Sequence, residues 1–410
     1  MKLLLLTQYF PPEVGAPQNR LFELAVRLQQ RGIEVTVLTA MPNYPQMEIH
    51  AAYRGKKYHF EEMEGLRVHR SSVYVTKDRG IVKRLRNYFS FVWSSYWCGR
   101  RKLEKQYDYI LCESPPLFLG ISAWMLCRNK SAKLIFNVSD LWPESAEKLG
   151  LVTNKLFLGL ARRLEEGLYK RSALITGQTQ GIVADIKRRF PEKTVYWLPN
   201  GVDLRYYRHD AQPQGWREKN GFAADDFLLL YAGIIGHAQG LEVILHAAAR
   251  LNEHKSIHFL LLGSGPVKAD LLVLKEQLQL TNVTFIDTVP KSEMPAIVAA
   301  SDAAVIPLRR LDLFKGAIPS KIFENLAMKK PIVLGVEGEA KELFIDEGKA
   351  GVFFTPENDE ELAAAVLKLH QNPELRRELA ENAFNYVREK FNRDTIAEGF
   401  YQLLNKHHGN

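Results

Sequence analysis

One stretch of the chain, residues 314–334, carries side chains whose types and spacing suit a phosphate ligand. Pro319 and Ser320 predict the start of a helix, with Ser320 as its N-cap. Lys315 precedes that start, and loop N–H groups before a helix N-terminus favour an anion, most often a phosphate. Glu324 follows one turn later, where it would repel a phosphate but could accept hydrogen bonds from sugar hydroxyls. The stretch predicts a nucleotide site, although a capped helix with a surface glutamate and lysine is also ordinary without any ligand.

The elements that must position this stretch follow a strand–loop–helix pattern. Residues 2–7 indicate a strand, residues 19–31 an amphipathic helix closed by Gly32, and residues 33–39 the next strand. Such units build a parallel sheet. A second series begins at Phe227, after a polar stretch that starts at Pro199. We therefore predict an α/β fold of two facing, Rossmann-like, doubly wound parallel-sheet domains, residues 1–200 and 201–385.

Loops at the carboxyl ends of the predicted strands carry the remaining candidates, because ligands bind at that edge of a parallel sheet. Four loops contain glycine: the loops at Gly15, at Gly233 to Gly240, at Gly263 to Gly265 and at residues 315–320. Their convergence favours a nucleotide in a cleft between two domains. Asp140 also follows a strand end, at residues 133–137, although it could equally cap a helix that begins near Pro143.

Composition and charge narrow the class of protein. The 410 residues are 46% hydrophobic and 25% charged, as in soluble globular proteins. Residues 1–200 hold 31 Lys/Arg and 18 Asp/Glu (+13), and residues 201–410 hold 24 and 29 (−5). The basic half predicts a negatively charged partner such as lipid headgroups, pyrophosphate or nucleic acid. Three cysteines without metal-ligand spacing indicate reduced thiols in the cytosol and no metal site.

The segment 77–105 is both basic and aromatic. It holds nine Lys/Arg against Asp78 and Glu104, interleaved with six aromatic residues: Tyr88, Phe89, Phe91, Trp93, Tyr96 and Trp97. A helix of this kind can lie in a membrane interface. The alternative is a partly buried helix with a solvated charged face.

Five motifs in order resemble one family over nearly the whole chain. They are Gln8-Tyr-Phe-Pro-Pro-Glu-Val-Gly15, Asp140-Leu-Trp-Pro-Glu144, Pro199-Asn-Gly-Val-Asp203, Gly233-Ile-Ile-Gly-His-Ala-Gln-Gly240 and Pro319-Ser-Lys-Ile-Phe-Glu324. They resemble family 4 retaining glycosyltransferases of the GT-B fold. Within the family, the sequence is most similar to the bacterial L-fucosaminyl transferases, which use UDP-L-FucNAc in O-antigen and capsule assembly.

The resemblance implies roles for individual residues in donor binding. Glu324 matches the second glutamate of a family pair and would hold the ribose hydroxyls. Gly316 stands where the first glutamate is expected, so backbone N–H groups of residues 316–318 (Gly316, Ala317, Ile318) would replace it. Ile234 and Gln239 occupy the places of a diphosphate-binding arginine and lysine.

Lys321, assisted by Lys315 or Arg309, would then neutralise the diphosphate, with Ser320 and the helix N-terminus. The resemblance places Gly15 near donor phosphate and acceptor, and Asp140 beside the sugar or the acceptor hydroxyl. Gly233 and Gly236 belong to the loop that lines the donor site. A C-terminal helix, residues 386–410, would cross back to the first domain.

The implied reaction is metal-independent and needs no cofactor besides the UDP-sugar substrate. An N-acetylated 6-deoxy amino sugar, best matched by L-FucNAc, would pass to a polyprenyl-diphosphate-linked saccharide. The enzyme would be cytoplasmic and peripheral on the inner face of the cytoplasmic membrane, held there by segment 77–105.

Two alternatives remain open from the sequence. A nucleotide-sugar epimerase of the same fold would act on soluble substrate and would not need segment 77–105. A nucleic-acid-binding protein would fit the basic charge, but no recognition motif supports it.

Overall fold

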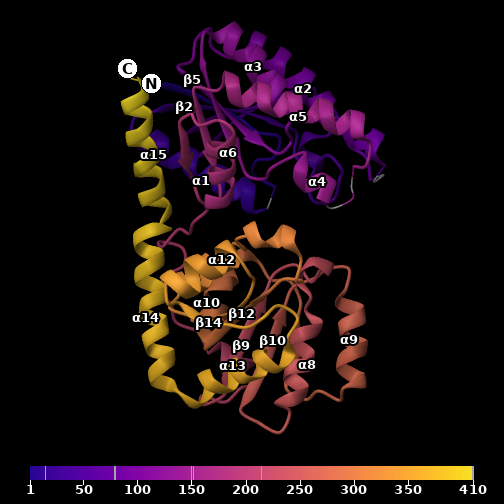
Figure 1. The fold of residues 1–410 in the computed structure, drawn as a ribbon, viewed down its shortest axis with the longest axis vertical. Helices are drawn as coiled ribbons and strands as arrows, with labels where there is room; N and C mark the ends of the chain where they lie inside the picture. Colours follow the sequence, from indigo (N-terminus) through magenta and orange to yellow (C-terminus); the bar gives the residue numbers. More distant parts are fainter. Residues whose placement is uncertain (14, 78–79, 149, 151, 214, 409–410) are drawn as a thin grey trace. The chain divides into compact units, whose positions relative to one another are not determined.

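The computed structural model describes residues 1–13, 15–77, 80–148, 150, 152–213 and 215–408. Three predicted segments include positions outside this part of the chain: residue 14 in the Gly15 loop, residues 78–79 in segment 77–105, and residues 409–410 at the C-terminus. The chain divides into two compact units, Met1–Asn200 with Arg393–Asn410, and Gly201–Asn392 (Figure 1).

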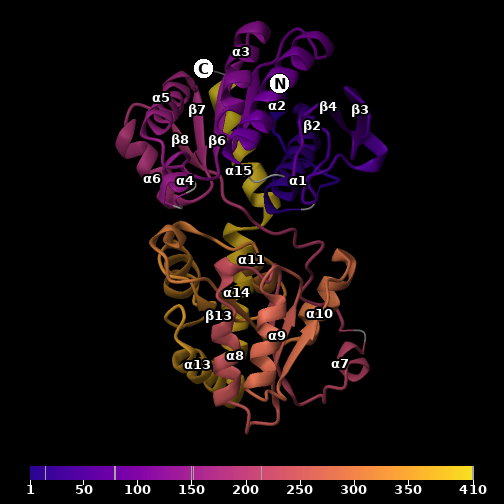
Figure 2. The ribbon, with the colours of Figure 1, turned by 90° about the vertical axis from the view of Figure 1, so that its right-hand side faces the viewer.

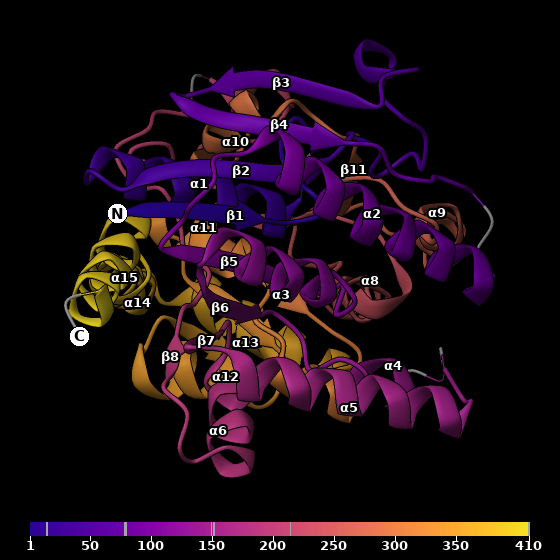
Figure 3. The same cartoon turned by 90° about the horizontal axis from the view of Figure 1, so that it is seen from above.

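The first unit is a sheet covered by helices on both faces. Its strands are β1 (Lys2–Leu6), β2 (Glu34–Ala40), β3 (Tyr58–Met63), β4 (Leu66–Ser71), β5 (Tyr109–Ser114), β6 (Lys133–Val138), β7 (Leu174–Gly177) and β8 (Val195–Trp197). Its helices are α1 (Ala16–Gln30), α2 (Ile81–Lys102), α3 (Leu119–Lys130), α4 (Glu144–Lys148), α5 (Lys155–Arg171), α6 (Gln180–Arg189) and α15 (Arg393–His408). The strand order is β3-β4-β2-β1-β5-β6-β7-β8, which can be followed in Figure 3.

Strand β3 makes the first sheet mixed and was not among the strands predicted from the sequence. It pairs antiparallel with β4, whereas the other neighbours in this sheet are parallel. Glu64 and Gly65 connect the two strands with φ of 48° and 79°, as a two-residue hairpin turn of type I′ requires. Because β3 is a charged edge strand that buries little surface, its sequence lacks a strong strand signal.

Alternate residues of each central strand face opposite layers of helices. Leu4 and Leu6 of β1 pack in the core formed with α2, α3, α5 and α6. Leu3 and Leu5 pack against α1 and against α15, which returns from the other end of the sequence (Figure 2). Alternation of this kind follows from the period of two in a strand.

The C-terminal crossing begins later in the sequence than predicted. Helix α14 (Pro373–Lys390) belongs to the second unit, and the first unit takes up the chain again at Arg393 instead of residue 386. Phe391 explains the difference, because its buried ring packs between Phe323 and Phe344 of the second unit. In the first unit, Arg27 then donates a hydrogen bond to Asp394 at 2.7 Å.

The second unit is a parallel six-stranded sheet with helices on both faces. Its strands are β9 (Phe227–Ala232), β10 (Ile257–Leu262), β11 (Val283–Ile286), β12 (Ala303–Pro307), β13 (Ile332–Gly335) and β14 (Gly351–Phe353), in the order β11-β10-β9-β12-β13-β14. Its further helices are α7 (Trp216–Lys219), α8 (Glu242–Arg250), α9 (Lys268–Gln277), α10 (Met294–Ala300), α11 (Lys321–Ala327), α12 (Glu339–Lys341) and α13 (Asp359–Gln371).

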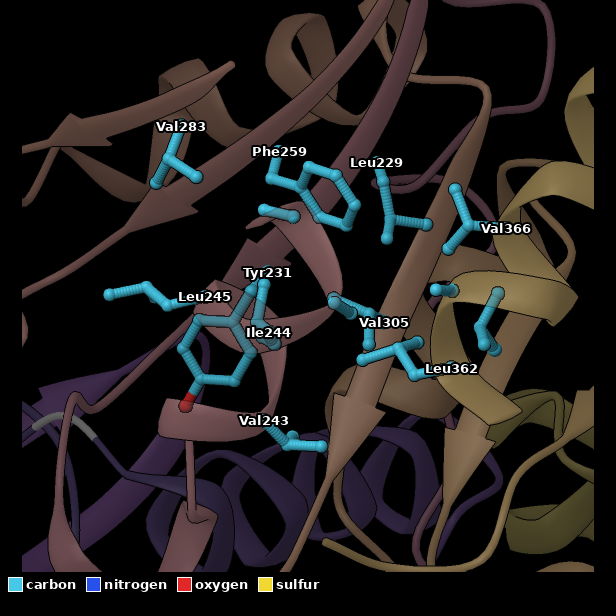
Figure 4. Packing of buried hydrophobic residues seen from close by; sticks show 14 of the residues in the cluster. Leu229, Tyr231, Val243, Ile244, Leu245, Phe259, Val283, Val305, Leu362 and Val366 are labelled. Atoms are coloured by element: carbon cyan, nitrogen blue, oxygen red, sulfur yellow. The ribbon is translucent and has the colours of Figure 1, made fainter. Parts of the chain in front are cut away.

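The core of this unit lies between the sheet and helices α8, α9 and α13. Leu229, Phe259 and Val305 project from three adjacent strands into it, and Leu362 and Val366 of α13 close it (Figure 4). Tyr231 is the last core residue of β9 and is fully buried. Its position fixes the start of the loop that follows β9.

Candidate functional site

The loops after β9 and β10 pack backbone against backbone at the carboxyl edge of the second sheet. The Gly233 amide donates to the Leu262 carbonyl at 2.9 Å, and the Ile235 amide donates to the Ser264 carbonyl at 2.9 Å. A methyl group on Gly263 would lie 1.9 Å from the carbonyl oxygen of Gly233. Gly233 and Gly263 both have positive φ, 145° and 144°, which only glycine adopts readily. These glycines therefore set the shape of the edge.

Lys321, the first residue of α11, lies over this edge. Its ammonium nitrogen is 3.8 Å from the centre of the Tyr231 ring, and a Cβ on Gly233 would lie 3.0 Å from it. Burial lowers the pKa of Lys321 to about 7, while the nearby Glu324 carboxylate acts in the opposite direction. An approaching phosphate would favour the charged form and raise this pKa. Sequence reasoning placed Lys321 in the site but missed Tyr231, because the two residues are 90 positions apart.

Lys315 and Arg309 do not point at the same place as Lys321. The Lys315 ammonium group pairs with Asp312 at 2.7 Å and is largely exposed. The Arg309 guanidinium bonds the His237 carbonyl at 2.7 Å and pairs with Glu242 and Glu357. Arg309 thus holds the loop that contains Gly236 in place. Lys315 and Arg309 therefore both have partners within the protein.

Ser320 is the N-cap residue of α11, as predicted, but it does not cap the helix through its side chain. Ser320 precedes α11, but its side chain accepts no capping hydrogen bond and its backbone is already helical, with φ −60° and ψ −28°. A capping side chain needs a non-helical backbone. The turn starts one residue earlier, since the Ile322 amide donates to the Pro319 carbonyl at 3.1 Å.

The loop before α11 differs in part from the prediction that the backbone N–H groups of residues 316–318 all face the ligand. Residues Asp312–Gly316 form a 3₁₀ turn, and the Ala317 amide donates to the Phe314 carbonyl at 2.9 Å. That amide is therefore used inside the protein, which corrects its assigned part in replacing the missing glutamate. Gly316 has open space where a side chain would be, and Ile318 continues the loop to Pro319.

Glu324 lies three residues after Lys321 on the half-buried side of α11. Residues at this spacing share a helix face. Its carboxylate raises the pKa of Lys321 and also contributes to the raised pKa of Tyr206, for which burial is the larger cause. The Tyr206 hydroxyl donates to the Lys291 carbonyl at 2.7 Å.

In the first unit, Gly15 and Asp140 occupy loops at strand ends. Gly15 precedes α1, and a Cβ there would lie 2.4 Å from the Gln18 side-chain oxygen. Asp140 follows β6 and accepts a hydrogen bond from the Ser145 hydroxyl at 2.7 Å. The carboxylate thus bonds a side chain of α4 instead of capping that helix through its backbone.

A buried polar network, which sequence reasoning missed, supports the same strand ends. The Arg20 guanidinium donates to Glu113 at 2.8 Å and to the Ser139 hydroxyl at 2.7 Å. Asn137 donates to the second oxygen of Glu113. Arg20 and Glu113 are 93 residues apart in sequence, so only the fold reveals the pair.

Helix α2 forms most of the basic aromatic segment. Its residues Phe91 and Val92 are buried, whereas Val82, Trp93 and Trp97 are 75%, 53% and 44% exposed. The guanidinium groups of Arg100 and Arg101 lie 5.5 and 4.9 Å from the Trp97 ring. The helix is therefore partly buried and also presents tryptophan beside arginine on its outer face.

Comparisons with known proteins agree with this architecture. Residues 15–201 match the family described as glycosyl transferase 4-like domain, and residues 214–386 match glycosyl transferases group 1. A relative from Escherichia coli K12, provisionally named the colanic acid biosynthesis glycosyl transferase WcaI, is 27% identical over 94% of this chain and 97% of its own. The protein is a glycosyltransferase of the GT-B, family 4 type.

Solved structures of low sequence identity share the fold of this glycosyltransferase. Sucrose-phosphate synthase from Thermosynechococcus elongatus has a TM-score of 0.76 at 17% identity, covering 99% of this chain and 98% of that one. Anabaena Alr3699/HepE in complex with UDP and glucose has a TM-score of 0.72 at 18% identity, covering 99% and 100%.

The part of this glycosyltransferase that the structure describes contains neither a metal-binding cluster nor a membrane-spanning helix. No group of three or more His, Cys, Asp or Glu side chains there could hold a metal ion. Likewise, none of the helices in that part of the chain has the length and apolar character needed to cross a bilayer.

Proposed function

We propose that this glycosyltransferase takes its sugar from a UDP-sugar bound at the carboxyl edge of the second sheet. The observation that carries the proposal is the position of Lys321, whose ammonium group lies beside Gly233 and over Tyr231. A cation at this edge of a parallel sheet suits the diphosphate of a nucleotide. The complex of Alr3699/HepE with UDP and glucose supports a UDP-linked donor.

Each candidate residue has a separate role in binding the donor or the acceptor. Lys321 neutralises the diphosphate, and Glu324 accepts hydrogen bonds from the ribose hydroxyls. Gly233 and Gly236 let the loop after β9 approach the phosphates closely, with the exposed Ile234 between them. Gly15 and Asp140, in the first unit, approach the acceptor side, where Asp140 orients a hydroxyl.

The proposed transfer retains the configuration of the sugar. The acceptor hydroxyl bonds to the anomeric carbon as the bond to the diphosphate oxygen breaks, and the departing phosphate takes the hydroxyl proton on the same face. Charge develops on the diphosphate, so protonated Lys321 stabilises the transition state by electrostatics and positioning. No further protein base is required.

The proposed substrates are an N-acetylated 6-deoxy amino sugar, L-FucNAc, carried by UDP, and a polyprenyl-diphosphate-linked saccharide of O-antigen or capsule assembly. The E. coli relative with a name from colanic acid biosynthesis supports a role in polysaccharide assembly. We place the enzyme on the inner face of the cytoplasmic membrane through the outer face of α2, where Trp93 and Trp97 lie beside basic residues.

The test is product analysis with UDP-L-FucNAc, with and without a polyprenyl-diphosphate-linked N-acetylhexosamine. Transfer with retained anomeric configuration, and no change of the donor alone, supports the proposal. An epimerised nucleotide sugar formed without acceptor would replace it with the epimerase alternative.

A further inference from the structure

A buried ion pair in the first unit contacts the start of the loop that carries Asp140. Arg20 of α1 donates to Glu113 of β5 at 2.8 Å, and their side chains are 7% and 4% exposed. Arg20 also donates to the Ser139 hydroxyl at 2.7 Å, and that hydroxyl donates to Glu113 at 2.5 Å. Ser139 directly precedes Asp140, so the ion pair is joined to the residue next to the candidate carboxylate.

The same network runs across three neighbouring strands. Glu113, Asn137 and Thr176 are register partners in β5, β6 and β7. Glu113 accepts from the Asn137 side chain, whose oxygen accepts from the Thr176 hydroxyl at 2.6 Å. The Glu113 carboxylate therefore receives donors at both of its oxygens, which fixes its orientation.

Folding stability gives a weak account of this ion pair. Taking two charges out of water costs free energy, and replacing such a pair by apolar residues is often neutral or stabilising. Among the described residues, moreover, the Nε atom of Arg20 has no hydrogen-bond partner, and an unmade buried donor adds to the cost. The pair is therefore better explained by the groups that it holds in place.

Hydrogen bonds to α4 and to β5 also fix the loop of Asp140. The Ser145 hydroxyl donates to Asp140 Oδ2 at 2.7 Å, and the Ser145 amide donates to the Leu141 carbonyl at 2.9 Å. The Ser139 amide donates to the Ser114 carbonyl at 2.8 Å. The hydrogen bond that the described residues make to the carboxylate uses Oδ2, so Oδ1 can accept from a substrate hydroxyl.

We propose that Arg20, Glu113 and Ser139 are positioning residues for the transfer step, because they fix Asp140 where it orients the acceptor hydroxyl. The inference rests on the proposed function, which gives Asp140 that task. Reactions between positioned groups are sensitive to displacements of about 1 Å, so the loop must keep one conformation. The ion pair provides the anchor, and the Ser139 hydroxyl connects it to the loop.

Amide hydrogen exchange of the full chain tests the anchor without any substrate. Ser139→Ala removes the hydroxyl and keeps the ion pair, and it should speed exchange of the amides of residues 139–145 about tenfold. Ser122→Ala is the matched control, because it removes a buried hydroxyl that bonds the Ser95 hydroxyl at 2.8 Å. This control should leave exchange in the loop unchanged. Equal exchange in the wild type and in Ser139→Ala would overturn the proposal.

Transfer kinetics with UDP-L-FucNAc and a polyprenyl-diphosphate-linked N-acetylhexosamine test the positioning role. Ser139→Ala should lower kcat about tenfold and leave KM for the donor unchanged. Ser139→Thr keeps the hydroxyl and should recover most of the lost rate. Because the hydroxyl acts through Asp140, Ser139→Ala should have no further effect in an Asp140→Ala background. Losses that multiply in the double variant would show a general effect on the fold and would refute the positioning role.

The charges themselves are tested by Arg20→Met/Glu113→Gln, which removes both and retains an amide acceptor in place of the carboxylate. Its control is Arg189→Met/Glu165→Gln, which neutralises a partly buried pair that joins α6 to α5 at 2.8 Å. Only the first variant should lower kcat, by about tenfold, and both should bind UDP as the wild type does, which shows that they are folded. An equal loss of kcat in both variants, or no loss in the first, would count against the anchor.

Transfer by the wild type separates this proposal from the proposed function. An active wild type whose kcat is unaffected by Ser139→Ala would remove the positioning role alone. A wild type that transfers no sugar from UDP-L-FucNAc would remove the proposed function, and the exchange result would then decide by itself whether the network anchors the Asp140 loop.

Discussion

The ammonium nitrogen of Lys321 lies 3.8 Å from the centre of the Tyr231 ring, at the point where β9 ends and the Gly233 loop begins. The ring face attracts the cation, while burial disfavours its charge and lowers the pKa of Lys321 to about 7. The lysine is therefore poised to take up a proton when a diphosphate arrives.

We predict that UDP binding is accompanied by proton uptake above pH 7. In the free protein the lysine is mostly neutral at pH 8, and the bound diphosphate raises its pKa, so about one proton is taken up. UDP affinity should fall as the pH rises from 7 to 9. Calorimetric titrations in buffers of different ionisation enthalpy measure the uptake. Lys321→Arg, which stays charged, should show neither effect, and uptake that persists in this variant would assign the proton to another group.

The carboxylate of Glu324 is predicted to have two separable effects. Glu324→Gln should weaken UDP binding about tenfold by loss of a charged acceptor for the ribose hydroxyls. It should also move the pH dependence of UDP affinity to lower pH, because the carboxylate raises the pKa of Lys321. Glu276→Ala, at an exposed position of α9, is the control. A pH profile identical to that of the wild type would show that the two side chains are uncoupled.

Gly263 is predicted to be required for the packing of the loop after β10 against the loop after β9. Gly263→Ala would place a methyl group 1.9 Å from the Gly233 carbonyl oxygen. The control, Gly32→Ala, shares the positive φ, here 88°, but meets no atom within 4 Å. Thermal unfolding should show a loss of about 1 kcal/mol for the control and a further 1–3 kcal/mol or so for Gly263→Ala. Equal stability of the two variants would contradict the close packing.

The outer face of α2 is predicted to bind anionic membranes. Arg100→Glu/Arg101→Glu reverses two charges beside the exposed Trp97, which should release the protein from phosphatidylglycerol vesicles at fixed salt. Lys187→Glu/Arg188→Glu makes the same change of charge on α6 and should leave sedimentation with vesicles unchanged. Equal release by both pairs would mean that net charge, and not this face, controls binding.

Local patterns in the sequence predicted most of the elements, because glycine and proline mark the ends of buried strands and amphipathic helices. Strand β3 was not predicted, because its charged residues lie at the edge of the sheet and bury little apolar surface. Ser320 occupies the predicted N-cap position of α11, but its side chain makes no capping hydrogen bond because the turn already starts at Pro319.

The pairing of site residues could not be predicted from local patterns. Arg309 pairs with Glu242 and Glu357, and Lys321 lies over the Tyr231 ring. These contacts join segments that are far apart in the sequence and that only the folded sheet brings together. Sequence therefore named the residues of the candidate site more readily than it assigned their partners.

Titration of UDP into the full chain and into Lys321→Met at pH 7 tests the central claim most directly. We predict that the wild type binds UDP and that Lys321→Met binds it at least tenfold more weakly, as expected for loss of one charge-assisted contact. Lys275→Met, on helix α9, should bind as the wild type does. A wild type that does not bind UDP, or a Lys321→Met variant with unchanged affinity, would contradict a donor site built around Lys321.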